Sequence, residues 1–159
     1  MDKLDVARQF GLLNRRSQAF ITAACADMGI AFSECVLLLN LYHRAGINQE
    51  NMSAILFIDK AATTRTIKSL EKKGFIKRQQ SDDDKRVKKL YLTEKGEATK
   101  EPIFAILERW MNFLSEGMDQ ATFDTVLKGL SFIAEKASSK EFYALCEKEE
   151  DEGVKRDEK

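Results

Sequence analysis

The most constraining stretch of this sequence is residues 48–96, where two short helical segments are followed directly by two β-leaning runs. Asn48 and Asp59 can each cap a helix, because their side chains accept hydrogen bonds from backbone amides of the first turn. Gly74 is placed to end the second helix. Since only a few residues separate the two helices, they predict a helix-turn-helix over about residues 48–74.

A β-hairpin is expected directly after this motif. Residues 75–80 and 87–92 are β-leaning, and a polar, turn-prone segment separates them. A hairpin that follows a helix-turn-helix is a wing, which the sequence places at about residues 75–93.

Helical periodicity dominates the rest of the chain, which has one proline and eight glycines in 159 residues. Apolar residues recur at three-, four- and seven-residue steps over residues 2–28, and Gly29 is expected to end that helix. Ser33 is a candidate N-cap for a second helix over residues 34–45.

Two further helices are expected over residues 97–146, with a cap in the segment that begins at Thr93. Pro102 predicts a kink or a displaced start in the first of them, and Asp119 can cap the second. Residues 147–159 are charged and lack apolar anchors, so we expect a frayed, disordered acidic tail there.

The net charge is zero, but the charges are unevenly distributed. Residues 60–95 contain twelve Lys and Arg against five Asp and Glu, whereas residues 141–159 contain eight acidic and four basic residues. A basic middle with an acidic end is expected of a local anion-binding surface, although a solvated charged hairpin gives the same pattern.

Several other classes of protein are not expected. Cys25, Cys35 and Cys146 are widely spaced, no C-x-x-C occurs and there is one histidine, so neither a disulfide framework nor a metal site is predicted. The sequence has no glycine-rich phosphate loop and no nucleophile with a base nearby, so we expect no enzyme activity and no cofactor. Without a visible signal peptide or membrane-spanning run, a cytoplasmic protein with no membrane partner is expected.

Three fragments carry a resemblance to a known family. Residues 48–53 stand where that family begins its first motif helix, residues 64–78 look like its recognition helix and first wing strand, and residues 84–87 with 92–96 look like its wing turn and exit. In this order and at this spacing, they resemble the multiple-antibiotic-resistance regulator (MarR) family.

The resemblance implies a fold. It is a single domain over residues 1–159, mainly α, in which six helices form a winged helix-turn-helix with a two-stranded β-wing. The DNA-binding lobe would span residues 33–96, and the helices over residues 2–28 and 97–146 would form a dimerisation lobe.

Three residues depart from the family pattern. Phe57 occupies a turn position that is often glycine, which predicts a wider turn. Ala61 stands where a small hydroxyl residue is common, and Thr63 replaces a residue that is usually apolar. None of these departures breaks the architecture.

The second motif helix presents a polar face for DNA, which consists of Lys60, Ala61, Thr64, Arg65 and Lys68. Arg65 is the best candidate to read a base, because a guanidinium can donate two bonds to O6 and N7 of guanine. Thr64 can touch a phosphate or a thymine methyl group, and the two lysines are expected on phosphates.

The wing adds a second set of contacts. Arg86 is expected to reach the minor groove or its phosphates, and Lys85 adds positive charge. Asp84 is expected to support Arg86 by holding its side chain in a local ion pair.

These features predict a homodimeric transcription regulator that binds a pseudo-palindromic operator in double-stranded DNA. The resemblance implies a repressor that a small aromatic or anionic effector releases from DNA. Arg16, Phe20, Tyr42 and His43 are the candidate effector-binding residues, and each of them is also explained as an ordinary core, surface or helix residue.

Two alternatives stay open. One is a redox-responsive regulator that uses Cys25 or Cys35, although buried structural thiols explain both residues more simply. The other is a winged-helix module that binds protein, which an acidic or apolar recognition face would favour.

Overall fold

The computed structural model describes residues 2–81, 84–139 and 141–142. The chain forms two compact units, residues 1–114 and 115–159, and each is described by itself. The elements of the first unit are α1 (Lys3–Ala24), a 3₁₀ turn (Ala26–Met28), α2 (Phe32–His43), β1 (Ile47–Asn48), α3 (Gln49–Leu56), α4 (Lys60–Lys72), β2 (Ile76–Gln80), β3 (Lys88–Leu92), α5 (Glu94–Glu97) and α6 (Lys100–Ser115). The second unit contains α7 (Gln120–Ala137).

The core of the first unit lies around α2, as the nearly continuous apolar composition of this helix predicts. Leu37, Leu38 and Leu41 of α2 have no exposed surface. They share one cluster of buried side chains with residues from α1, α3, α4, both long strands and α6, which include Ile21, Met52, Ile67, Leu70, Phe75, Leu90 and Ile103. The predicted DNA-binding motif therefore shares one core with the end of α1 and the start of α6.

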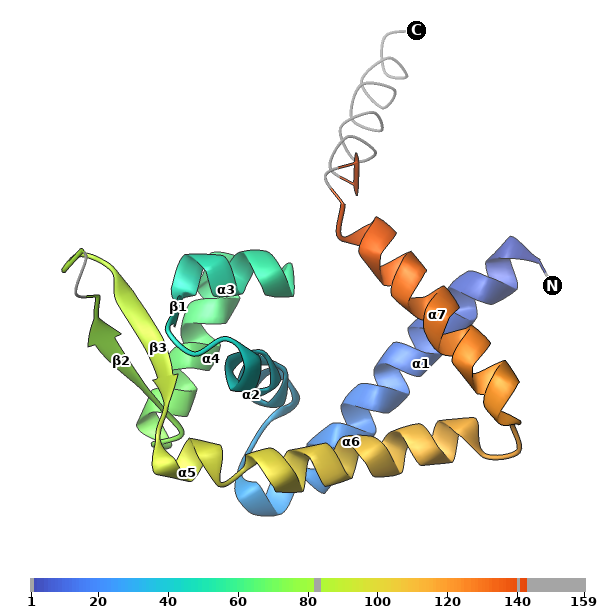
Figure 1. Ribbon diagram of the computed structural model, residues 1–159, viewed down its shortest axis with the longest axis horizontal. Helices are drawn as coiled ribbons and strands as arrows, with labels where there is room; N and C mark the ends of the chain where they lie inside the picture. Colours follow the sequence, from blue (N-terminus) through green and yellow to red (C-terminus); the bar gives the residue numbers. More distant parts are fainter. Residues whose placement is uncertain (1, 82–83, 140, 143–159) are drawn as a thin grey trace, which may run out of the picture. The chain divides into compact units, whose positions relative to one another are not determined.

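The sheet has three antiparallel strands in the order β1-β3-β2, which is one strand more than the predicted two-stranded wing. Ile47 pairs with Leu90 and Asn48 with Lys89, while β2 pairs with β3 from Ile76 opposite Leu92. The short strand β1 comes directly before α3, so the sheet joins the wing to the start of the helix-turn-helix (Figure 1).

Helix α2 begins earlier than predicted, and the assignment of Ser33 as its N-cap is wrong. The N-cap is Ala31, and the backbone amide of Ala31 donates a hydrogen bond of 2.8 Å to Oε2 of Glu34. A glutamate at the third helical position that binds back to the N-cap amide satisfies an otherwise unpaired donor. Gly29 has φ +66°, the left-handed conformation expected of a glycine that ends a helix.

The displaced start predicted from Pro102 is confirmed. Thr93 caps the single turn of α5 by accepting a 3.1 Å hydrogen bond from the amide of Gly96, and a separate helix, α6, begins at Lys100. Pro102 lies in the first turn of α6, where its missing N–H leaves no helical hydrogen bond unmade. A Cβ on Gly96 would lie 2.1 Å from the backbone oxygen of Phe75, so this position requires glycine.

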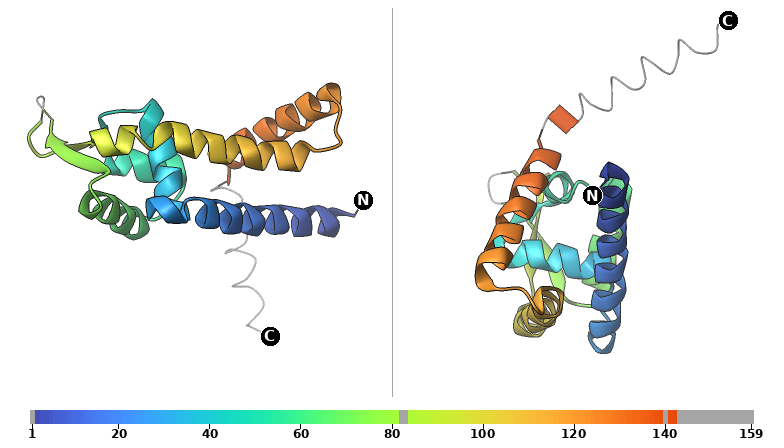
Figure 2. Two further views of the ribbon diagram at one scale, coloured as in Figure 1. Left: turned by 90° about the horizontal axis from the view of Figure 1, so that it is seen from below. Right: turned by 90° about the vertical axis from the view of Figure 1, so that its right-hand side faces the viewer.

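Within the first unit, α1 and α6 extend from the lobe on the side away from the wing (Figure 2). Nε1 of Trp110 on α6 donates a 3.1 Å hydrogen bond to the hydroxyl of Ser17 on α1, and the rings of Phe20 and Trp110 stack with centroids 4.9 Å apart. These two helices are called the arms below.

In the second unit, Asp119 caps α7 as predicted, with a 2.8 Å hydrogen bond from the amide of Thr122. Helix α7 buries no residue within the chain, although its apolar side chains include Leu130, Phe132 and Ile133. The acidic tail predicted for residues 147–159 lies outside the described residues. None of the described helices has the length and apolar composition needed to cross a membrane.

Candidate nucleic-acid interface

Two helices joined by a short turn form the helix-turn-helix, as predicted. Asn48 and Asp59 cap α3 and α4, each accepting a 2.8 Å hydrogen bond from an amide of the first turn. Phe57 ends α3 with φ 51° and ψ 38°, and it is the one non-glycine residue with positive φ in the part of the chain that the structure describes. The wider turn expected at Phe57 is wrong, because the backbone of Phe57 takes the left-handed conformation that glycine would take in the same tight turn.

One face of α4 is buried and the opposite face is exposed. Thr63, Ile67 and Leu70 pack into the core, and the hydroxyl of Thr63 donates a 3.1 Å hydrogen bond to the carbonyl oxygen of Asp59. This backbone bond allows Thr63 to occupy a core position without an unpaired polar group. The predicted set of Lys60, Ala61, Thr64, Arg65 and Lys68 lies away from the core, with Thr64 half-buried and the others exposed.

The predicted DNA-binding side chains of α4 differ in how they are held. Lys60 pairs with Glu50 of α3 at 3.1 Å, with both side chains well exposed. The hydroxyl of Thr64 donates to the carbonyl oxygen of Lys60 and accepts from the side-chain amide of Gln49, both at 2.6 Å. Arg65 and Lys68, in contrast, have no ion pair or side-chain hydrogen bond with any described residue. Their charges are therefore available to an external anion.

The contact between Asp84 and Arg86 differs from the prediction. Oδ1 of Asp84 accepts a 2.9 Å hydrogen bond from the backbone amide of Arg86, and the amide of Val87 bonds to the carbonyl oxygen of Asp84. The expected ion pair with the Arg86 guanidinium is absent among the contacts of the described residues. Asp84 thus fixes the backbone of the turn, and both Lys85 and Arg86 are exposed.

Sequence reasoning missed a small polar groove between the wing and the start of α3. It has a volume of about 330 Å³, and its lining includes Asn48, Gln49, Arg78, Arg86 and Lys88. The groove exists because β1 pairs with β3, and a two-residue strand has no periodicity that a sequence pattern can reveal.

Two of the four predicted effector-binding residues lie together. Arg16 and Phe20 of α1 line an apolar groove between the arms with a volume of about 750 Å³, whose lining also includes Trp110 and Phe113 of α6. Phe20, Trp110 and Phe113 form a stacked row, and the Arg109 guanidinium lies 5.1 Å from the centre of the Phe20 ring. Aromatic faces next to cationic groups suit a planar anion.

The other two predicted effector residues lie elsewhere. The hydroxyl groups of Tyr42 and Thr99 are 2.8 Å apart, and the ring of His43 stacks on Phe104 with centroids 6.3 Å apart. Neither Tyr42 nor His43 lines the groove between the arms. The four residues therefore do not form one site.

The two cysteines considered for redox sensing are buried. Cys25 and Cys35 are 0% and 1% exposed. Burial raises the pKa of the Cys35 thiol to about 12, and it also raises the pKa of Cys25. Because the thiolate is the nucleophile that reacts with oxidants, this environment favours structural thiols over reactive ones.

Comparison with known proteins places the chain in a family. The model of the MarR family matches residues 32–88, which run from the start of α2 to the start of β3. The HTH-type transcriptional regulator YybA of Bacillus subtilis is 30% identical over 92 residues, 58% of this chain. That match spans 61% of the length of YybA.

Solved structures match over more of the chain. A MarR transcriptional regulator from Methanosarcina mazei is 30% identical with a TM-score of 0.81, and the match covers 85% of this chain and 97% of that one. A MarR family regulator from Listeria monocytogenes, solved with a 26-mer DNA, is 26% identical with a TM-score of 0.81, over 91% and 94% of the two chains. The predicted resemblance is confirmed, and the chain belongs to the MarR family of winged-helix transcriptional regulators.

Proposed function

We propose that this protein regulates transcription by binding double-stranded DNA sequence-specifically through α4 and the wing. The observation that carries the proposal is the pair of exposed cations, Arg65 and Lys68, that have no partner among the described residues on the outer face of α4. Exposed Lys85 and Arg86 follow on the wing of the same lobe. The DNA in the Listeria relative supports the same use of the fold.

In this proposal, α4 enters the major groove with its N-terminal half. Arg65 reads guanine through two hydrogen bonds, and Lys68 neutralises a phosphate. Lys60 exchanges its ion pair with Glu50 for a contact with a phosphate. Breaking this ion pair costs little free energy, because both side chains are exposed. Arg86 and Lys85 bind along the adjacent minor groove or its phosphates.

The proposed active form is a homodimer on a pseudo-palindromic operator. On the first unit, exposed apolar side chains of α1 include Leu4, Phe10 and Leu12, and the second unit carries the exposed apolar residues of α7. An exposed apolar surface of this extent marks an interface, and a two-fold pair presents two recognition helices about one DNA turn apart. These side chains lie in the described parts of the predicted dimerisation helices, 2–28 and 97–146.

We further propose repression that ends when a small aromatic anion binds between the arms, next to Arg16 and Phe20. The stacked aromatic row and the nearby guanidinium groups are the features that support this ligand class. The proposed site of action is the cytoplasm, and the proposed function includes no catalytic step.

DNA binding is tested by fluorescence anisotropy with labelled duplexes, first a random-sequence duplex across a range of salt concentrations and then duplexes selected from a random pool. Arg65→Ala is expected to cost about 1–3 kcal/mol on a selected duplex and much less on a random one. Lys72→Ala, an exposed lysine of the same helix, is the charge-matched control. Salt-independent or absent binding by the wild type would contradict the proposal and favour a protein-binding module.

The effector proposal has an internal probe, because Trp110 is the single tryptophan of the chain and lines the groove. Titration with aromatic carboxylates is expected to change its fluorescence and to lower DNA affinity in parallel, whereas acetate does neither. Arg16→Ala is expected to weaken both responses. A fluorescence change without loss of DNA affinity would support ligand binding in the groove, but it would refute the proposal that the ligand releases the protein from DNA.

A further inference from the structure

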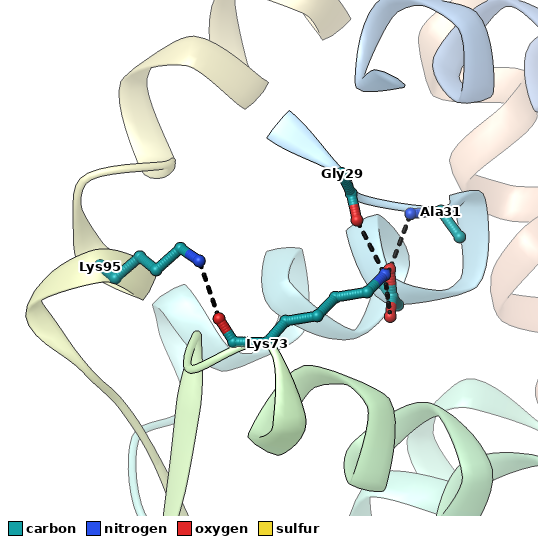
Figure 3. Close-up of polar contacts among 5 residues, drawn as sticks. Gly29, Ala31, Lys73 and Lys95 are labelled. Carbon is teal, nitrogen blue, oxygen red and sulfur yellow. Dashed lines mark hydrogen bonds and ion pairs between the residues drawn. The ribbon is translucent and has the colours of Figure 1, made fainter. Parts of the chain in front are cut away.

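The C-terminal end of the recognition helix α4 is bonded to the chain segments next to the bases of both arms of the same unit (Figure 3). Lys73, the C-cap residue of α4, extends its ammonium group into the junction between α1 and α2. Nζ of Lys73 donates to the carbonyl oxygen of Gly29 at 2.7 Å and to the two carboxylate oxygens of Glu34 at 2.8 and 2.6 Å. Glu34 in turn accepts the amide of Ala31.

This contact is more than a surface ion pair. The Glu34 side chain is 3% exposed, so its charge is compensated mainly within the protein, by Lys73, the Ala31 amide and Ser69. The acceptor Gly29 belongs to the turn that directly follows α1 and its 3₁₀ extension. One ammonium group therefore connects the end of α4 to the turn that follows α1 and to the start of α2.

The second connection starts from the other side. Nζ of Lys95, in α5, donates a 2.8 Å hydrogen bond to the carbonyl oxygen of Lys73 and lies 4.3 Å from the centre of the Phe75 ring. Helix α5 leads directly into α6, the second arm. The backbone and the side chain of Lys73 are thus held by the chain segments at the bases of the two arms, and we call this arrangement the Lys73 clamp.

We propose that the Lys73 clamp sets the angle of the recognition helix relative to the arms, and that Glu34, Lys73 and Lys95 are positioning residues for DNA binding. In a dimer built through the arms, this angle fixes the distance between the two recognition helices. The clamp therefore determines which spacing of operator half-sites the protein accepts. The inference rests on the proposed function, since it concerns how a DNA-binding dimer is aligned.

The test is a spacing profile. An operator selected by the wild-type protein is prepared with its own central spacer and with spacers one base pair longer and shorter. We expect the wild type to bind the operator with its own spacer more tightly than the other two. In the double variant Glu34→Gln/Lys73→Met, the ratio of these affinities should fall about tenfold. In this variant the side-chain amide oxygen introduced at position 34 can still accept the Ala31 amide, and no buried charge is left unpaired.

Two further variants make the result specific. Lys72→Met changes a neighbouring exposed lysine with no role in the clamp and should keep the wild-type profile. Lys95→Met removes only the exposed second connection, so it should relax the profile in the same direction by a smaller factor. It also provides the test if the double variant fails to fold, as judged by its thermal unfolding.

The outcomes separate the two proposals. A wild type that binds no duplex overturns the proposed function, and the clamp proposal with it. If the wild type binds DNA and the clamp variants keep its spacing profile, the clamp proposal alone is overturned. Equal loss of affinity for all three spacers overturns it as well, because that result assigns Glu34 and Lys73 a purely structural role.

Discussion

At the scale of single residues, Phe57 is the clearest conflict between side chain and backbone. Its φ of 51° places an aromatic L-residue in the left-handed region, and its side chain is 55% exposed, so little packing offsets the strain. Phe57→Gly is expected to raise the free energy of unfolding by about 1 kcal/mol. Urea denaturation measures this, and Ile58→Gly, at the next residue with ordinary φ, is expected to lower stability instead.

Arg86 is the residue whose proposed role in DNA binding is easiest to isolate, because its side chain is exposed and its backbone is fixed by Asp84. Arg86→Ala is expected to weaken binding about equally on all sequences and to reduce the slope of log affinity against log salt by about 1. Anisotropy titrations at several salt concentrations measure both. A variant that keeps the wild-type slope would place Arg86 away from the phosphates.

Which residues lie on the outer face of α4 was largely predictable, whereas their contacts were not. The exposed face of α4 follows from helical periodicity, so Arg65 and Lys68 could be placed from the sequence. The pairing of Lys60 with Glu50 and the Asp84 contact with a backbone amide depend on side-chain geometry across a turn. Sequence spacing does not determine such geometry.

At the scale of elements, local signals were reliable and pairing between distant segments was not. The caps at Asn48, Asp59 and Thr93 were all predicted, because a cap involves residues within one turn. Ser33 was assigned wrongly since Glu34 can bind back to the Ala31 amide, a competing local solution. Strand β1 was missed because it is defined by its partner β3.

The junction of α1, α2 and α4 gives a pH prediction. Burial raises the pKa of Glu34, but the Ala31 amide, Lys73 and Ser69 together outweigh it, so the pKa lies below its ordinary value of 4.5. The stability from ionised Glu34 is therefore complete above about pH 5 and is lost as pH falls through the lowered pKa. The wild type should lose more stability than Glu34→Gln between about pH 5 and 3.

Urea denaturation at a series of pH values measures this difference. Other carboxylates titrate in the same range in both proteins, so the quantity to compare is the gap between the two stability curves. Parallel curves would show that the Glu34 carboxylate contributes nothing through its charge.

At the scale of the whole molecule, the exposed apolar side chains give a prediction about the oligomeric state. Helix α7 carries Phe132 at 71% exposed and Ile133 at 48% exposed, an unfavourable arrangement for an isolated chain in water. The wild type is expected to sediment as a dimer at micromolar concentration. Phe132→Glu should raise the dimer dissociation constant by roughly tenfold or more.

Sedimentation velocity over a range of concentrations measures this shift. Lys77→Glu, which reverses the charge of an exposed residue of β2 outside the predicted dimerisation helices, is the control and should leave the dimer intact. A wild-type monomer at these concentrations would remove the basis for a two-fold operator.

The way Thr64 is held has a consequence for the operator itself. Its hydroxyl proton is already donated to the Lys60 carbonyl, and its oxygen accepts the Gln49 amide, so Thr64 has no proton left to donate, and we expect an incoming base to contact its methyl group, Cγ2. Such an apolar contact cannot distinguish thymine from 5-methylcytosine, since both carry the same substituent at C5. If the base at this position is cytosine, methylation at C5 would create the same methyl contact that thymine offers. Replacement of thymine by uracil would remove this contact.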